Sequence, residues 1–171
     1  MTPANHLTAN DLKSHGSESC NTMSVCNAGG NPKKELAQAI LDVKPFMSRP
    51  QMRAMLELRK SEEGMHFCRT FVDVATRIRA MPVTYEQDGL GNLAVVHLHY
   101  FLGASDWYIL EKDIEGGVQQ AFGYAVLNGD EQCAELGYIS IEEITRCGAE
   151  LNLYFQPCTL ADIKSKRRDR L

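Results

Sequence analysis

The chain has 171 residues, of which 44% are hydrophobic, and its formal net charge is −4. This length fits one domain of ordinary size, and this apolar fraction is enough to build a buried core. The sequence contains no apolar run long enough to span a bilayer and no apolar secretory segment, so we expect a cytoplasmic protein rather than a membrane or secreted one. Six cysteines without a repeating spacing are expected to be reduced thiols.

Charge is distributed unevenly along the chain. Residues 33–81 contain ten basic and six acidic residues, whereas residues 105–144 contain nine acidic residues and one basic residue, Lys112. The end of the chain is basic again, with five Lys and Arg residues from position 164 onward. Faces of opposite sign steer charged partners and favour head-to-tail self-association, so the pattern indicates a charged partner and is compatible with a homo-oligomer.

The first half of the chain predicts a tail followed by helices. Residues 1–32 are rich in Ser, Thr, Asn and Gly and have no sustained period, which predicts a disordered tail. Residues 33–81 predict a helical segment. It begins with a short amphipathic helix over 33–44 and continues as a helical hairpin over 50–81, whose first helix is capped by Ser48.

Residues 82–163 predict a strand-rich, acidic domain, and residues 164–171 predict a basic tail. A short helix capped by Ser140 is expected before the last strand. Short turns join the strands, which favours antiparallel pairing because parallel neighbours need long crossovers. The expected strands cover 93–101, 107–112, 119–127, 134–139 and 151–155.

The expected fold class is therefore α+β, with a mainly antiparallel four- to five-stranded sheet and an amino-terminal helical hairpin packed on it. Alternation along the first strand predicts one face with two histidines and an opposite, apolar face. The first face would carry Val95, His97, His99 and Phe101, and the opposite face Val96, Leu98 and Tyr100.

Several segments of the strand-rich domain also resemble a known family. They are MPVTYEQDGLGN, HLHYFLGASDWYILEKD, AFGYAVL, ELGYISIEEI and AELNLYFQPCTLADI, with W-Y-x-x-E and E-L-G-Y-I-S as strand motifs. The chain resembles small bacterial proteins of unknown function that are carried largely by plasmids, phages and integrative elements, over residues 81–163. The resemblance implies a mobile genetic element, where small acidic proteins act on host defence or on element maintenance. It implies no catalytic residues.

The aromatic strands and their charge favour binding over catalysis. Trp107, Tyr108, Tyr124 and Tyr138 lie in a stretch whose charged residues are nearly all acidic, a setting that repels phosphate backbones. We therefore expect a non-enzymatic binding protein of a mobile genetic element whose acidic strand-rich surface engages a basic host protein. Its expected action is to inhibit a nucleic-acid-directed defence complex, of the anti-CRISPR or anti-restriction type. The expected partner-binding residues are Asp106, Trp107, Glu111, Asp113, Glu115, Asp130 and Glu131.

The first alternative is a metal-assisted hydrolase or nuclease. His97 and His99 lie two apart on an expected strand and would hold a metal with Glu111 or Glu135 as a third ligand. Two histidines without a defined third ligand are a weak pattern, and a hydrogen-bonded pair is more typical. We expect no catalytic residue, no cofactor and no bound metal.

The second alternative is a nucleic-acid-binding accessory protein of plasmid maintenance. It would use Arg69, Arg77 and Arg79 of the helical hairpin together with the basic tail, and its binding would depend steeply on salt. Nucleic acid is the less favoured partner because the strand-rich domain is acidic.

Overall fold

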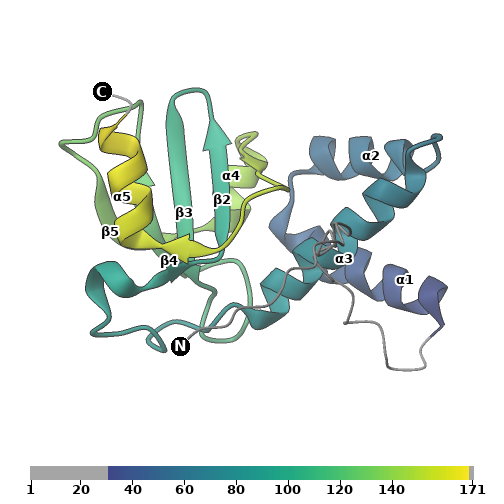
Figure 1. Ribbon diagram of the computed structural model, residues 1–171, viewed down its shortest axis with the longest axis horizontal. Coiled ribbons are helices and arrows are strands. Elements are labelled where there is room, and N and C mark those ends of the chain that lie inside the picture. Colours follow the sequence, from purple (N-terminus) through teal and green to yellow (C-terminus); the bar gives the residue numbers. More distant parts are fainter. Residues whose placement is uncertain (1–30, 170–171) are drawn as a thin grey trace, which may run out of the picture.

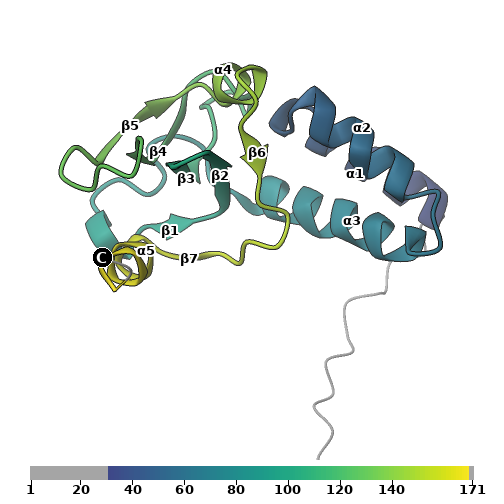
Figure 2. The same ribbon diagram turned by 90° about the horizontal axis from the view of Figure 1, so that it is seen from above.

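The computed structural model describes residues 31–169, so the predicted tail over 1–32 lies almost wholly outside the described residues, as do the last two residues of the basic tail. The described chain forms three layers (Figures 1 and 2). Helices α1 to α3 cover one face of a sheet, and α5 with a long loop covers part of the other face. The predicted α+β class, with amino-terminal helices on an antiparallel sheet, is confirmed.

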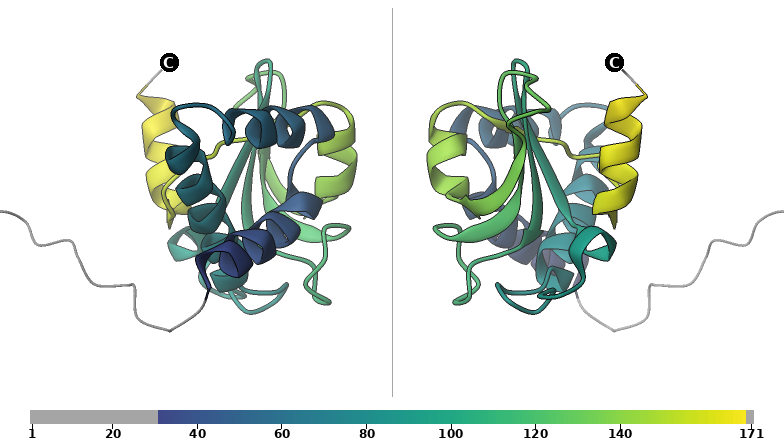
Figure 3. Two further views of the ribbon diagram at one scale, coloured as in Figure 1. Left: turned by 90° about the vertical axis from the view of Figure 1, so that its right-hand side faces the viewer. Right: turned by 90° about the vertical axis from the view of Figure 1, so that its left-hand side faces the viewer.

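Three helices, rather than a hairpin alone, form the first layer. Figure 3 (left) shows them in front of the sheet. The Ser48 side chain accepts a hydrogen bond from the Gln51 amide, as its position before a proline-containing first turn predicts. α1 packs along the third helix, where the sequence placed only a short separate helix. The elements are α1 (Pro32–Val43), the 3-10 turn η1 (Lys44–Phe46), α2 (Arg49–Leu58) and α3 (Gly64–Ala80).

The main sheet has five antiparallel strands in the order β5-β4-β3-β2-β6. Its two edges are therefore β5, which comes from the middle of the domain, and β6, which comes near its end. A separate two-stranded ladder pairs β1 with β7. The strands are β1 (Val95–Val96), β2 (Leu98–Leu102), β3 (Ser105–Glu111), β4 (Ala121–Val126), β5 (Glu135–Ile139), β6 (Glu150–Leu151) and β7 (Cys158–Thr159), and the remaining elements are η2 (Gly91–Leu93), α4 (Ile141–Arg146) and α5 (Leu160–Arg168).

Two strand predictions were wrong in detail. The predicted strand over 93–101 is broken at His97, and Val96 belongs to a different buried cluster from Leu98 and Tyr100. The break changes the alternation, so the predicted common face for these three residues does not exist. The predicted strand over 151–155 shrinks to β6, because the chain then leaves the sheet and returns to pair with β1.

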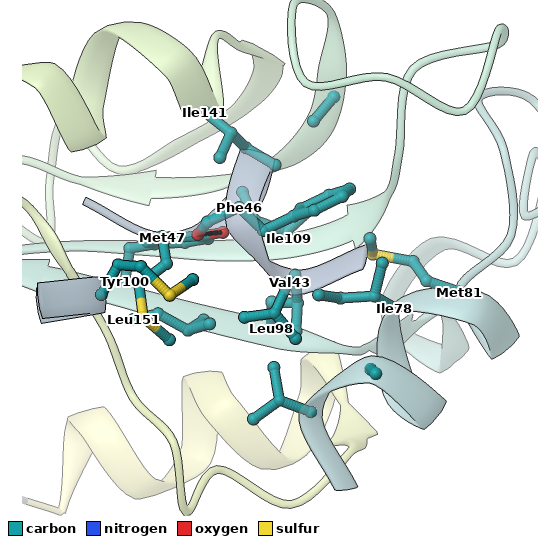
Figure 4. Packing of buried hydrophobic residues seen from close by; sticks show 14 of the residues in the cluster. Val43, Phe46, Met47, Ile78, Met81, Leu98, Tyr100, Ile109, Ile141 and Leu151 are labelled. Atoms are coloured by element: carbon teal, nitrogen blue, oxygen red, sulfur yellow. Dashed lines mark hydrogen bonds between the residues drawn. The ribbon is translucent and has the colours of Figure 1, made fainter. Parts of the chain in front are cut away.

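The larger core lies between the helices and the sheet (Figure 4). Val43 and Phe46 from the amino-terminal helices meet Leu98, Ile109 and Leu151 from the strands, and all five are nearly inaccessible to solvent. Tyr100 is fully buried in the same cluster, and its hydroxyl donates a 2.7 Å hydrogen bond to the Phe46 carbonyl. Burial raises the pKa of this hydroxyl far above its usual value. This layer fixes the sheet that carries the surfaces described below.

The smaller core lies on the opposite face of the sheet. Leu160 and Ile163 of α5 pack with Tyr108, Tyr124 and other strand residues. Thr159 and Asp162 form a capping box that starts α5. The helix continues through Arg168, so most of the predicted basic tail is an ordered helix against the sheet.

The edge strand β6 is capped by a side chain from a distant helix. Gln51 of α2 donates from its side-chain amide to the Leu151 carbonyl at 2.7 Å and accepts from the Leu151 amide at 2.9 Å. The side chain thus makes the two hydrogen bonds that another strand would make. The β6 edge is closed to a further strand at this residue.

Candidate functional site

An open cleft of about 420 Å³ lies between the loop over 84–94 and strands β3 to β5. Its walls are mainly aromatic and aliphatic, and no Lys or Arg lines it. We call it the tyrosine cleft. It is lined by Thr84, Tyr85, Gln87, Asp88, Gly89, Gly91, Ala94, Leu110, Glu111, Phe122, Leu136 and Tyr138.

A bulge in β3 places Glu111 in this cleft. The register of β3 against β4 shifts between Ile109 and Glu111, so that Glu111 pairs with Phe122. Leu110 and Glu111 consequently both line the cleft, whereas regular alternation would send them to opposite faces. The bulge therefore places the Glu111 carboxylate in a wall of the cleft that strands β3 to β5 otherwise line with apolar and aromatic side chains.

Glu111 organises the loop that forms the other wall. Its side chain is buried, with 3% of the residue exposed, and its carboxylate accepts hydrogen bonds from the backbone amides of Tyr85 and Gln87. The Gln87 side chain in turn bonds the backbone of Val95 and Leu110. Two amides satisfy the buried charge, as such a charge requires. The loop is held firmly against β3 as a result.

Tyr85 and Tyr138 face each other across the mouth of the cleft. Tyr85 adopts a positive φ of 82°, which is rare for a residue with a large side chain. Its hydroxyl lies 2.9 Å from the Tyr138 hydroxyl, a hydrogen bond that raises the pKa of Tyr138. The rings nevertheless stay in solvent, with Tyr85 65% and Tyr138 59% exposed. Exposed aromatic rings beside a hollow are typical of binding surfaces.

A second site is a polar network around Arg167 of α5. The guanidinium donates to Asp106 at 2.6 Å, to the Tyr108 hydroxyl at 3.0 Å and to Glu131 at 2.6 Å. Its side chain is 12% exposed, against 22% for Asp106 and 25% for Glu131. On the other side of Asp106, the His99 ring bonds the carboxylate at 2.8 Å.

The network controls the ionisation of its members. Burial acts to raise the pKa of Asp106, but hydrogen bonds from His99 and Arg167 outweigh it and the pKa is lowered. For Arg167, burial acts to lower the pKa, and hydrogen bonds to Asp106, Tyr108 and Glu131 raise it beyond the usual value. Both groups are therefore held in their charged forms, and the network stabilises α5 against the sheet.

A smaller cavity of about 330 Å³ adjoins this network and is lined by His99, Asp106, Asn152 and Cys158 among others. A thiol beside a histidine raises the question of a nucleophile. Burial raises the pKa of Cys158, which is opposite to the shift that activates a nucleophilic cysteine. The His99 ring already bonds Asp106 and Asn152. The arrangement favours a structural role.

The seven predicted partner-binding residues do not form one group. Asp106, Asp130 and Glu131 lie towards the start of β3 and the β4–β5 loop, and two of them are paired with Arg167. The predicted residues at the other end of β3 are Glu111, Asp113 and Glu115. Asp106 and Glu111 are five residues apart on β3, so at the rise of an extended strand they lie about 16 Å apart.

Several of these seven side chains have internal partners. Glu111 is buried in the tyrosine cleft, and Asp113 accepts from the Glu115 and Gln120 amides. Asp130 accepts from the Gln132 and Cys133 amides but stays exposed. Trp107 is half-buried and packs against the helix-side core.

The structure also shows the surroundings of the two histidines that the metal-assisted hydrolase would use. His99 stacks on Tyr108 and bonds Asp106, whereas half-buried His97 has its pKa lowered by burial and by Lys112. Within residues 31–169, no group of three or more His, Cys, Asp and Glu side chains has an arrangement that could hold a metal ion. Within the same range, no helix is both long and apolar enough to cross a membrane.

The helical arginines are largely engaged. The Arg77 guanidinium donates to the carbonyls of Leu153 and Phe155, and burial lowers its pKa. Arg79 pairs with Asp42 of α1. These two side chains therefore stabilise the helix layer and its contact with the chain after β6.

The sequence predictions missed the tyrosine cleft. The sequence pattern indicates Tyr138 as one of the aromatic residues of the acidic strand-rich stretch, but it does not indicate Tyr85, Leu136 or Asp88. One signal was available: Leu136 and Tyr138 are two apart in E-L-G-Y-I and share a strand face. The partner wall could not be found this way, because it comes from an irregular loop.

Comparisons of the chain with protein-family models, with curated proteins and with solved structures found no match.

Proposed function

We propose that the chain is a non-enzymatic binding protein that engages a basic protein partner through the tyrosine cleft and the acidic residues around it. The observation that carries this proposal is the combination of exposed aromatic rings with a cleft whose only charged lining residues are Asp88 and Glu111. Apolar contact supplies affinity, and negative charge selects a basic surface and speeds its approach.

The proposal keeps the expected biological setting and changes the contact residues. The setting is the cytoplasm of a bacterium that carries a mobile genetic element, with a nucleic-acid-directed defence complex as the target. Proteins that handle nucleic acid present basic grooves, which suit an acidic partner. Exposed Asp88, Glu115, Asp130 and Glu135 replace the internally paired carboxylates as candidates for charged contacts.

The test is isolation of the partner followed by direct measurement. Tagged protein is used to purify partners from the host bacterium, and the affinity for each purified partner is then measured at several salt concentrations. We expect a partner rich in Lys and Arg whose affinity falls as salt rises. The variant Asp88→Lys should weaken binding, whereas Glu57→Lys, an exposed charge reversal on α2, should not. Equal effects of the two reversals would contradict the proposal.

A DNA-binding measurement distinguishes the proposed function from the second alternative, a nucleic-acid-binding accessory protein. Binding of purified protein to double- and single-stranded DNA is measured at low salt. We expect no affinity, because the exposed aromatic rings lie among carboxylates. Tight, salt-sensitive DNA binding would instead favour an accessory protein of plasmid maintenance.

A further inference from the structure

We propose that the free edge of β5 binds an extended segment of the basic partner as an added strand, and that an Arg or Lys side chain of this segment enters the tyrosine cleft. This inference rests on the proposed function and gives it a binding mode. It follows from the state of the two sheet edges, from the side chains beside β5 and from the charge of the cleft.

The two edge strands of the main sheet differ in whether their outward backbone groups have hydrogen-bond partners. Leu151 on the β6 edge is capped by Gln51, as described above. β5 is the last strand on the opposite side, where Figure 2 shows it at the outer margin of the sheet. Among the described residues, the backbone of β5 makes no hydrogen bond outside its ladder with β4. The outward amides and carbonyls of β5 are therefore available to another strand.

β5 also lacks most of the features that usually protect an edge strand, and its one charged residue, Glu135, would repel an acidic strand but not a basic one. Its sequence is Glu-Leu-Gly-Tyr-Ile, with no Lys, no Pro and no bulge against β4. Gly137 lies at its centre, and a Cβ added there would meet no heavy atom within 4 Å. A side chain at position 137 would point to the face opposite Leu136 and Tyr138, so no neighbouring atom covers the centre of β5 on that opposite face.

The cleft lies beside this edge. Leu136 and Tyr138 pair with Tyr124 and Phe122 of β4 and share their face of the sheet, which is the face of the cleft. Leu136 is 42% exposed, and Tyr85 closes the far side of the mouth. Alternate side chains of an added strand point to the same face, so one of them would lie next to Tyr138.

The charge of the cleft determines which side chain fits. Asp88 is exposed at its rim, Glu111 lies at its wall, and no basic residue lines it. Phe122, Tyr85 and Tyr138 offer aromatic faces, which attract a guanidinium or ammonium group. A basic side chain gains both interactions, whereas an acidic one would be repelled. The occupant is therefore an extended segment with Arg or Lys among residues of high strand propensity.

The experiment uses two synthetic peptides with blocked ends, Val-Arg-Val-Arg-Val-Arg-Val and the same peptide with Glu in place of Arg. Each is titrated into the full-length, isotopically labelled protein while backbone amide shifts are recorded by NMR. We expect the Arg peptide to bind at least about tenfold more tightly than the Glu peptide. The largest amide shifts should fall on residues 135–139 and on Tyr85. An Arg peptide with N-methylated backbone amides should not bind, because it cannot form the ladder.

Two matched variants test the cleft itself. Tyr138→Ser should weaken binding of the Arg peptide about 5- to 10-fold. Tyr154→Ser removes a tyrosine of similar exposure, 63%, from the other cavity and should leave binding unchanged. Circular dichroism of both variants checks that they fold.

Several outcomes would overturn this inference. They are absence of binding by the Arg peptide, shifts centred away from β5, equal affinity for the N-methylated peptide, and a stable dimer in which a second copy occupies β5. The proposed function fails separately, if no basic partner is isolated or if Asp88→Lys has no effect on its affinity. A partner that binds with salt-sensitive affinity and is not displaced by the Arg peptide would leave the proposed function standing without this binding mode.

Discussion

The Arg167 network gives the sharpest test of the fold. In the variant Arg167→Met, the hydrocarbon part of the side chain is largely kept while the guanidinium is lost. Asp106 and Glu131 then remain partly buried without their cation. Breaking a fully buried pair costs about 3–5 kcal/mol, and a surface pair contributes about 0–1 kcal/mol. Because the carboxylates are 22% and 25% exposed, solvent screens part of the effect and we expect a loss of about 2–3 kcal/mol.

Urea unfolding followed by circular dichroism measures this loss. With a denaturant dependence of about 2 kcal/mol per molar urea, the midpoint should fall by about 1–1.5 M. The control is Arg168→Met, which removes the neighbouring, exposed arginine and should change stability by less than about 0.5 kcal/mol.

A second variant shows whether charge causes the loss. Adding Asp106→Asn and Glu131→Gln to Arg167→Met removes the two uncompensated carboxylates and should restore about 1 kcal/mol or more. The reasoning is refuted if Arg167→Met is as stable as Arg168→Met, or if the triple variant is no more stable than Arg167→Met alone.

Three further predictions concern stability. The pKa of Asp106 is lowered in the folded state, so its contribution to stability is present above about pH 4 and is lost as the pH falls through the folded pKa. Asp106→Asn should therefore be less stable than the wild type at pH 6, and the difference in urea midpoint should narrow as the pH falls below about 4; a difference that is independent of pH would contradict this. A Cβ at Gly123 would lie 2.5 Å from the Tyr108 carbonyl oxygen, so Gly123→Ala should cost about 1–3 kcal/mol in thermal or urea unfolding. Gly137→Ala meets open space and should cost less than about 0.5 kcal/mol; equal costs would show that close packing does not select glycine at position 123. Glu111→Gln weakens the two hydrogen bonds that hold the loop and should cost about 1–3 kcal/mol, with faster hydrogen exchange at the Tyr85 and Gln87 amides. Glu115→Gln, an exposed control, should leave both measurements unchanged, and unchanged exchange in Glu111→Gln would mean that another contact holds the loop.

The sequence by itself determined the fold class and most of the secondary structure. Ser48 and Ser140 cap the helices that follow them, as the sequence predicts, because a cap forms between residues three apart. The alternating aromatic and β-branched residues predicted β3, β4 and β5 within about two residues of their bounds. Short turns predicted antiparallel pairing. These features depend on neighbouring residues, which is why sequence patterns report them.

Charge patterns predicted less, because the sequence shows which charges exist and not which meet. The sequence pattern assigns Asp106 and Glu131 to an acidic surface and Arg167 to a basic tail. The fold brings the three together over separations of 36 and 61 residues. Their charges are largely compensated inside the molecule, and the exposed carboxylates are a smaller set.

Only the tertiary structure decided where a partner has access. A bulge turns Glu111 into the cleft, and an irregular loop brings Tyr85 to Tyr138. Gln51 closes the edge at Leu151, one hundred residues away, while β5 stays open. Each outcome depends on contacts between segments that are distant in the chain, and the local pattern that makes a strand does not specify whether the strand ends up at a free edge.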